Sequence, residues 1–373
     1  MEFEAAKKAL ITALAGKKSF AIGYHPDADG IAGTALLIKY LKKQGAAREE
    51  IDLYPINNLH RSFSETHLNQ IMAAKYDAII YIDCAISDNE QISRVAAHFK
   101  PVICIDHHHY QRGLEAIPHL YINSVDFAGM TKPDLFTTSK LMHAMFYDPS
   151  DDWLELLGLE GDVVIQSIKG SPIYEAAQRL NMLGLVEEYG VSIKGVTERR
   201  NGLVALLLDT KDASDLLHRL VMDKQLESLY GDIIGDIEAN LNHLRQAKPK
   251  LVFKDNKIFT HKISTVKGFD IAEHILKSHI RYLGYNETFV IYSISPSPLM
   301  GEGFTLRIYT SNPKIDCERI VRSFGGGGHQ RRAGITNVKL PSPLVGEGQG
   351  EGVKGIITGI VDEIKTMAKT NHP

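Results

Sequence analysis

Two stretches decide the fold of this chain: residues 20–30, FAIGYHPDADG, and residues 101–108, PVICIDHH. Each is a short apolar run followed at once by carboxylates and imidazoles. Such runs, bounded by turn residues, are typical of buried strands. So many acidic groups cannot converge unless cations offset their repulsion. The first candidates for metal ligands are therefore His25, Asp27, Asp29, Asp106 and His107.

Strand and helix signals alternate through the first half of the chain. The expected strands are 20–24, 51–56, 77–83 and 101–106, and the expected helices are 1–15, 31–45, 64–74 and 88–98. These connections are too long for hairpins, so the pattern predicts a mainly parallel sheet with helices on both faces. The polar groups that follow the strands should share one crevice at the carboxyl ends of the strands. Asn57, Asn58, His60 and Arg61 are expected at the edge of that crevice, although a surface loop explains them equally well.

The second half of the chain predicts a change of architecture. Residues 134–246 have a mostly helical pattern, and strand signals return at 250–265, 289–295 and 304–310. We predict an α/β domain at 1–190, a helical connector at 191–248 and a smaller α/β domain at 249–373. The segment PSPLMGEG at 296–303 recurs as PSPLVGEG at 341–348. Its Pro and Gly content predicts exposed surface insertions.

Composition excludes several classes of protein. Of 373 residues, 44% are hydrophobic and 23% charged, and the net charge of −3 argues against a protein that coats long nucleic acid. Three cysteines give no disulfide framework, which favours a reduced, cytoplasmic location. The N-terminus lacks the pattern of a signal peptide, and no apolar run is long enough to span a membrane. The composition is compatible with a homodimer.

Six residues form a candidate constellation for metal ions. Taken alone, each has an ordinary structural explanation: a helix N-cap, a turn aspartate, a solvated histidine or a loop aspartate. Together, four carboxylates balance two dications, and the mixture with imidazole favours two Mn²⁺ ions, with Mg²⁺ or Co²⁺ as substitutes. Two ions about 3.5–4 Å apart suit phosphoryl chemistry. The predicted ligands are His25, Asp27, Asp29, Asp83, His107 and Asp162.

A second polar landmark is GGGGHQRRAG at residues 325–334. Glycines let a backbone approach a phosphate closely, and arginine binds phosphate through two parallel hydrogen bonds. A glycine-rich turn with a solvated basic pair is the alternative. The predicted substrate-binding residues are Gly326, Gly327, Gly328, His329, Arg331 and Arg332.

The ordered set of HPDADG, Asp83, DHH, GLEGD and GGGGHQRRAG resembles the DHH phosphoesterase superfamily with a DHHA1-type C-terminal domain. That group includes the exonuclease RecJ, oligoribonucleases and pAp phosphatases of the NrnA type, and cyclic-dinucleotide phosphodiesterases. The resemblance covers nearly the whole chain. It implies a metal-binding DHH domain at 1–190 and a DHHA1 domain at 249–373.

The resemblance also implies a role for each site residue. Asp27 and His25 would bind one Mn²⁺ ion, Asp29, His107 and Asp162 the other, and Asp83 both. His108 would contact the scissile phosphate or assist the leaving group. Asp106 would orient the histidines.

These features together predict a hydrolase of nucleotides or short oligonucleotides, such as nanoRNA, pAp, or linear and cyclic dinucleotides. A RecJ-like single-strand exonuclease is the first alternative, although no run of stacking aromatics or basic residues supports it. A non-catalytic module that binds nucleotides or nucleic acid is the alternative of another class. An inorganic polyphosphatase is a third, which GGGGHQRRAG disfavours.

Overall fold

The computed structural model divides the chain into two compact units. The first comprises Met1–Glu187 and Val191–Asp232, and the second comprises Glu188–Gly190 and Ile233–Pro373. The segment expected as a connector, 191–248, is therefore shared between them. The residues that the structure describes are 2–56, 62–84, 89–108, 116–127, 137–162, 170–186, 193–246, 250–253, 258–263, 288–297, 301–310, 312, 314–324, 326–329, 332–339 and 350–369.

The first unit is built on a five-stranded sheet in the order β2-β1-β3-β4-β5, with every neighbouring pair parallel. This confirms the predicted α/β class. The strand that the sequence pattern did not predict is β5, which lies at one edge of the sheet. The strands are β1 (Phe20–Tyr24), β2 (Ile51–Pro55), β3 (Ala78–Ile82), β4 (Val102–Asp106) and β5 (Leu120–Asn123).

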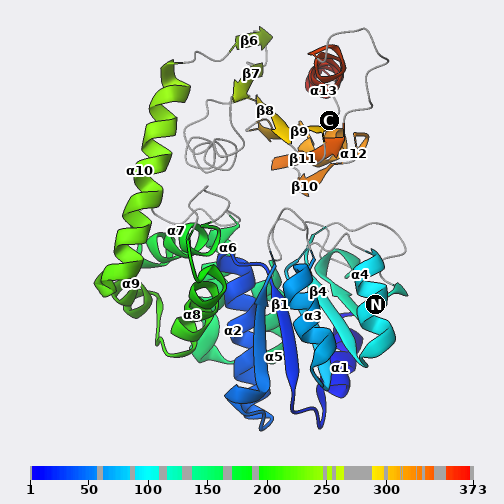
Figure 1. Ribbon diagram of the computed structural model, residues 1–373, viewed down its shortest axis with the longest axis vertical. Coiled ribbons are helices and arrows are strands. Elements are labelled where there is room, and N and C mark those ends of the chain that lie inside the picture. The colour runs from blue at the N-terminus through cyan, green and yellow to red at the C-terminus, as the bar shows by residue number, and fades with distance from the viewer. Residues whose placement is uncertain are drawn as a thin grey trace. The chain divides into compact units, whose positions relative to one another are not determined.

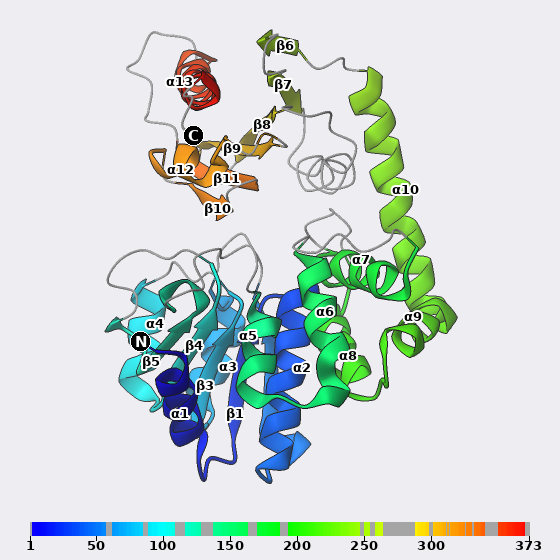
Figure 2. The same ribbon diagram turned by 180° about the vertical axis from the view of Figure 1, so that it is seen from behind.

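Helices cover both faces of this sheet. Figure 1 shows α3 and α4 on the near side of the sheet, and Figure 2, seen from behind, shows α1 and α5 on the near side. Alternate strand residues explain this division: Ile79, Tyr81 and Cys104 pack under α3 and α4, whereas Ile82 faces α2. The helices are α1 (Phe3–Leu14), α2 (Ala28–Lys43), α3 (Glu65–Ala73), α4 (Asn89–His98) and α5 (Thr138–Phe146).

The remaining helices of this unit are α6 (Asp152–Gly161), α7 (Pro172–Gly184), α8 (Val196–Leu208) and α9 (Ala213–Met222). The first three pack around α2, which is almost wholly buried, and the fourth packs against α7. The long helix α10 (Lys224–Gln246) begins in the first unit and continues into the second. The predicted start of α2 at residue 31 is wrong by one turn, because Asp27 caps the helix by accepting a hydrogen bond from Gly30 N. Asp29 therefore lies in the first turn of α2, and not in an extended turn.

The strand order reverses between β1 and β3, because β2 pairs with one edge of β1 and β3 pairs with the opposite edge. Ligand sites of open α/β sheets lie at such a reversal, beyond the carboxyl ends of the strands. Two hydrogen bonds extend the parallel ladders past the strands, from His25 N to Ile82 O (3.1 Å) and from Asp83 N to Ile105 O (3.0 Å). The ladder thereby fixes both residues at the same edge of the sheet.

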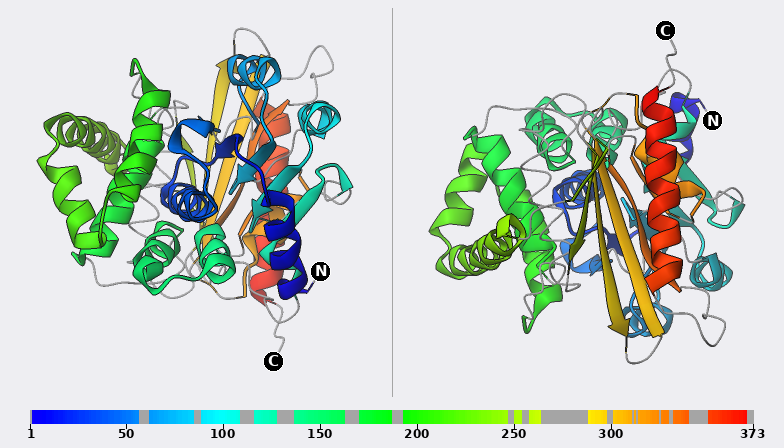
Figure 3. Two further views of the ribbon diagram at one scale, coloured as in Figure 1. Left: turned by 90° about the horizontal axis from the view of Figure 1, so that it is seen from below. Right: turned by 90° about the horizontal axis from the view of Figure 1, so that it is seen from above.

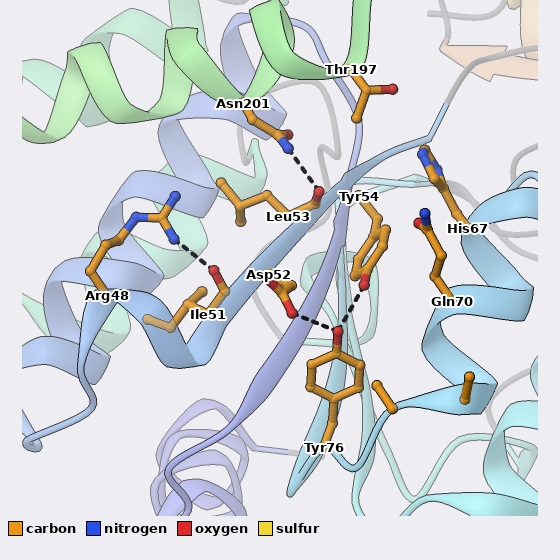
Figure 4. A pocket seen from close by; sticks show the side chains of 12 residues that line it. Arg48, Ile51, Asp52, Leu53, Tyr54, His67, Gln70, Tyr76, Thr197 and Asn201 are labelled. Carbon is orange, nitrogen blue, oxygen red and sulfur yellow. Dashed lines mark hydrogen bonds between the residues drawn. The ribbon is translucent and has the colours of Figure 1, made fainter.

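A cavity of about 680 Å³ lies along the outer edge of β2 (Figure 4), and none of the predicted site residues lines it. Its polar groups bond to one another. Arg48 donates to Ile51 O at 2.6 Å, and Asn201 donates to Leu53 O at 2.9 Å. Tyr76 donates to Asp52 at 2.6 Å. Side chains thus occupy two outward carbonyls of an edge strand, which protects that edge from pairing with another chain.

The second unit contains a six-stranded sheet in the order β10-β11-β9-β8-β7-β6. Only β7 and β8 pair in parallel; the other pairs are antiparallel. Helices α12 (Cys317–Arg322) and α13 (Gly350–Lys369) bury apolar residues against this sheet, and Figure 3 (right) shows α13, in red, lying along it. The strands are β6 (Lys250–Phe253), β7 (Ile258–Ile263), β8 (Thr288–Ser297), β9 (Gly301–Thr310), β10 (Gly327–His329) and β11 (Arg332–Lys339).

The first copy of the repeated octapeptide lies partly in two paired strands, and its predicted exposure stays a prediction. Pro296 and Ser297 end β8, residues 301–303 begin β9, and the register pairs Pro296 with Glu302. The copy therefore extends an antiparallel hairpin. The second copy lies outside the described residues. Among the described helices, none is long and apolar enough to cross a membrane.

Candidate metal centre

The side chains predicted as metal ligands converge from the ends of five helices and strands of the first unit. His25, Asp83 and His107 directly follow β1, β3 and β4, the three central strands. Asp27 and Asp29 begin α2, and Asp162 caps the C-terminus of α6. Three groups of these side chains place their ligand atoms within 4.8 Å of one another: His25/Asp27/Asp83, Asp29/His107/Asp162 and Asp83/His107/His108.

Asp83 lies at the centre of this arrangement. One of its carboxylate oxygens, Oδ2, is 3.6 Å from His25 Nδ1, and the other, Oδ1, is 3.2 Å from His107 Nε2. The residue is 2% exposed and has a φ of 59°, the one positive value among described non-glycine residues. Backbone strain of this kind concentrates at functional sites. It turns the Asp83 side chain toward both histidines.

Asp29 is fully buried at the N-terminus of α5. Thr138 N donates to its Oδ2 at 2.7 Å, and Ser139 N donates to its Oδ1 at 2.9 Å. The unpaired N–H groups of a helix N-terminus favour a carboxylate. Thr138 also donates from its hydroxyl to Asp83 Oδ1 at 3.0 Å. Thr138 therefore connects two carboxylates, a role that its helical sequence context gave no reason to predict.

The charges of the metal-free cluster are unbalanced. Burial, together with the carboxylates of Asp83 and Asp162, raises the pKa of Asp29 well above its usual value. Burial alone would raise the pKa of Asp83, but hydrogen bonds to His107 and His25 hold it well below the usual range. Burial opposes charge on both histidines, yet the surrounding carboxylates raise the pKa of His25 and of His107 well above normal. Without metal, the protonated imidazoles of His25 and His107 thus supply positive charge that two divalent cations would otherwise provide.

The Asp106 carboxylate organises the DHH segment from within. Its Oδ1 accepts hydrogen bonds from His107 N at 2.7 Å and His108 N at 3.2 Å, and it lies 2.8 Å from His108 Nδ1. Asn123, at the end of β5, donates to His108 O at 2.8 Å. Asp106 belongs to none of the three ligand groups, whereas His108 joins one through Asp83. Sequence reasoning did not identify Asn123.

Three glycines allow α6 and α7 to pack directly on the N-terminal end of α2, which carries Asp27 and Asp29. A methyl group on Gly158 would overlap Asp29 and Ser139, and one on Gly184 would overlap Pro26 O. One on Gly161 would lie 2.6 Å from Ala28 Cβ. The glycines were not predicted, because their reason is a close approach between segments far apart in the sequence.

Replacing Gly158 by Ala should lower the free energy of unfolding by about 1–3 kcal/mol, the usual cost of overpacking a core. The matched control is Gly202→Ala in α8, where an added methyl meets nothing within 4 Å. Since alanine favours helix, Gly202→Ala should stabilise by roughly 0.5–1 kcal/mol. Urea unfolding measures both. Equal stability of Gly158→Ala and wild type would contradict the close packing.

The predicted substrate-binding residues lie in the second unit. Residues 327–329 form β10 and pair with Arg332, Ala333 and Gly334 of β11. Gly326 has a structural role, since a methyl there would overlap Gly334 O. Arg331 lies outside the described residues, as do the side chains of His329 and Arg332. Asn57, Asn58, His60 and Arg61, predicted at the cleft edge, also lie outside them.

Solved structures share this fold. A member of the s1p family of ribosomal proteins with a DHH domain superposes with a TM-score of 0.68 at 14% identity, covering 97% of this chain and 91% of that one. RecJ from Thermus thermophilus, in complex with Mn²⁺, superposes at 0.58 with 17% identity, and all of this chain spans only 55% of it. An exopolyphosphatase-related protein from Bacteroides fragilis superposes at 0.50 with 16% identity over 98% of each chain.

A comparison with protein families identifies one domain of the chain. Residues 20–156 match the model described as "DHH family, N-terminal domain". No curated protein sequence matches the chain. The matched region holds every predicted ligand except Asp162, so residues 20–156 match the N-terminal domain of the DHH family and include most of the candidate metal centre. The DHHA1-type domain stays a prediction.

Proposed function

We propose that this protein is a metal-dependent phosphoesterase that hydrolyses nucleotides or short oligonucleotides with two Mn²⁺ ions. The observation that carries the proposal is the pair of ligand groups, His25/Asp27/Asp83 and Asp29/His107/Asp162, joined by Asp83. Asp83 lies between His25 and His107, so its two oxygens are suited to bridging two ions. The match of residues 20–156 to the N-terminal domain of the DHH family and the likeness to RecJ solved with Mn²⁺ support it.

The donor set fits two hard or borderline divalent ions. It offers carboxylate oxygens and imidazole nitrogens and no thiolate, which suits Mn²⁺ and Mg²⁺. Asp162 Oδ2 is buried and makes no hydrogen bond of good geometry among the described residues, as expected of an atom reserved for a ligand. When bound, two such ions supply a water-derived nucleophile at neutral pH and stabilise the attacking and leaving oxygens of an in-line displacement.

The protein's own side chains would then position the substrate. His108 is the most exposed of the DHH and ligand side chains, at 23%, and Asp106 fixes its ring through Nδ1. We propose that His108 contacts the scissile phosphate or the leaving group, with Asp106 as its positioning residue. We assign substrate binding to Gly326–His329 with Arg331 and Arg332, because glycine backbone and arginine suit phosphate.

A single-strand exonuclease is the second candidate, favoured by the superposition on RecJ. The small negative net charge of −3 favours short substrates instead, since long nucleic acid is held chiefly by basic surfaces. A binding module without activity is disfavoured, because such a module would have no need of the complete set of six candidate ligands.

The test is turnover in Mn²⁺ of pAp, linear dinucleotides, cyclic dinucleotides and single-stranded DNA by wild type and Asp27→Ala. We expect wild type to hydrolyse a short substrate and the variant to lose roughly 10²–10³-fold in kcat, as when an electrostatic group is removed from an active site. Degradation of long DNA alone would favour the exonuclease. Identical turnover by both proteins would contradict the metal site.

A further inference from the structure

One buried amide connects the two segments that carry Asp29 and Asp162. Asn181 lies in α7 and is 6% exposed. Its Oδ1 accepts a hydrogen bond from Ala28 N at 2.7 Å, and its Nδ2 donates to Gly161 O at 3.0 Å. Ala28 is the residue before Asp29, and Gly161 is the residue before Asp162.

Both bonded groups lie at helix ends that need a partner. Ala28 N is in the first turn of α2, and Gly161 O is in the last turn of α6. Such groups have no partner within their own helix, and an unpaired one costs about 1–3 kcal/mol when buried. A single side chain satisfies a donor of one helix and an acceptor of another, so it fixes their separation.

The two ligand groups depend on this contact to different degrees. In the first, Asp27 has its own anchors, because it accepts from Gly30 N at 2.9 Å and lies 2.9 Å from His25 Nδ1. In the second, Asp162 Oδ2 makes no good hydrogen bond among the described residues and lies 3.2 Å from His107 Nε2. The location of Asp162 therefore rests on the backbone at the end of α6, which Asn181 holds.

We infer that Asn181 is a positioning residue that sets the affinity of the Asp29/His107/Asp162 metal site without touching the metal. This inference rests on the proposed two-metal function. Partners that orient ligands change metal affinity by roughly 10–100-fold. Asn181→Asp preserves the shape and the acceptor for Ala28 N, but it replaces the donor to Gly161 O by an oxygen. The end of α6, and with it Asp162, should be displaced.

The matched control is Asn201→Asp. Asn201 also joins distant segments with one accepted and one donated bond, from Tyr24 OH at 3.0 Å and to Leu53 O at 2.9 Å. It bonds to no backbone group next to a candidate ligand, because its contact with Tyr24, the residue before His25, is made through the side-chain hydroxyl of Tyr24. A general loss of stability from replacing a hydrogen-bonded asparagine would appear in both variants, whereas weaker binding of one metal ion should appear only in Asn181→Asp.

The experiment measures Mn²⁺ binding to the full-length protein by calorimetry and by electron paramagnetic resonance. Wild type should bind two ions with the signal of a coupled pair. Asn181→Asp should bind one ion normally and the other roughly 10–100-fold more weakly, with the six-line signal of an isolated ion at low loading. In an Asp162→Ala background, which already lacks the second site, Asn181→Asp should add no further loss.

The outcomes separate the two proposals. Wild type without Mn²⁺ binding would overturn the proposed function and the inference with it. If Asn181→Asp binds two Mn²⁺ ions with the affinities of wild type, or if both affinities fall equally, the inference alone is overturned. If Asn181→Asp does not fold, Asn181→Ser, which keeps one hydrogen-bonding group, is measured against the same expectations.

Discussion

Replacing Asp83 by Asn should reduce phosphoesterase activity about 10³-fold, the upper range for loss of one electrostatic group, while the protein remains folded. Asparagine is tolerated in the left-handed region that Asp83 occupies, with its φ of 59°. The substitution therefore keeps the backbone and changes one oxygen to an amide. The neutral side chain cannot offset the charge of two cations, so both ions should bind more weakly.

Two companion variants make the expectation specific. Asp83→Ala loses the same ligand and also places in the left-handed region a residue whose side chain cannot form local hydrogen bonds, which costs about 1–2 kcal/mol. The melting temperature of Asp83→Ala should therefore fall below that of Asp83→Asn. Asp77→Asn changes an aspartate just before the same strand, where it accepts from Lys18 N and Ser19 N. Full activity of Asp83→Asn, or an equal loss in Asp77→Asn, would contradict a bridging role.

The convergence of the ligand residues could be predicted from the sequence because it depends on strand ends. His25, Asp83 and His107 each follow an apolar run, and the carboxyl ends of parallel strands meet at one edge of a sheet. Both explanations of Asp27 hold at once: it caps α2, and it lies 2.9 Å from His25. A capping role therefore does not compete with a place in the cluster.

What escaped prediction depends on tertiary contacts between distant segments. Thr138 and Asn181 lie in ordinary amphipathic helices, and nothing local indicates that one contacts Asp29 and Asp83 and the other joins α2 to α6. Strand β5 follows a segment without clear periodicity, so its place beside β4 becomes visible only through pairing. These partners were missed because a hydrogen bond between segments far apart in the sequence leaves no regular spacing that could predict it.

Removing metal should make the protein less stable as pH rises, and adding Mn²⁺ should reverse that trend. In the folded metal-free state, the pKa values of His25 and His107 are raised above 6.5 by neighbouring carboxylates. Their stabilising effect is complete below that pH and is lost as pH rises through the folded values. The raised pKa of Asp29 acts in the same direction, since its ionisation in the fold is unfavourable above 3.8.

Asp83 does not counteract this trend at neutral pH, because its lowered pKa gives stability that is already complete above 3.8 and is lost only in acid. Above pH 6.5, each histidine that keeps its proton in the folded state, while the unfolded chain has lost it, should lower the stability by about 1 kcal/mol per pH unit. Metal binding requires deprotonated ligands, so the stabilisation by Mn²⁺ should grow over the same interval. At a free concentration 100 times the Kd, it should reach about 2.7 kcal/mol per site.

Thermal unfolding in a chelator and in Mn²⁺, at several pH values, measures both effects. The melting temperature should fall with pH in the chelator and change little in Mn²⁺, so the difference between the two curves widens toward alkaline pH. Asp83→Asn serves as the control, since a protein that binds both ions weakly should gain little from Mn²⁺ at any pH. A Mn²⁺ effect that is independent of pH would mean that the ion binds away from His25 and His107, because binding there must displace their protons.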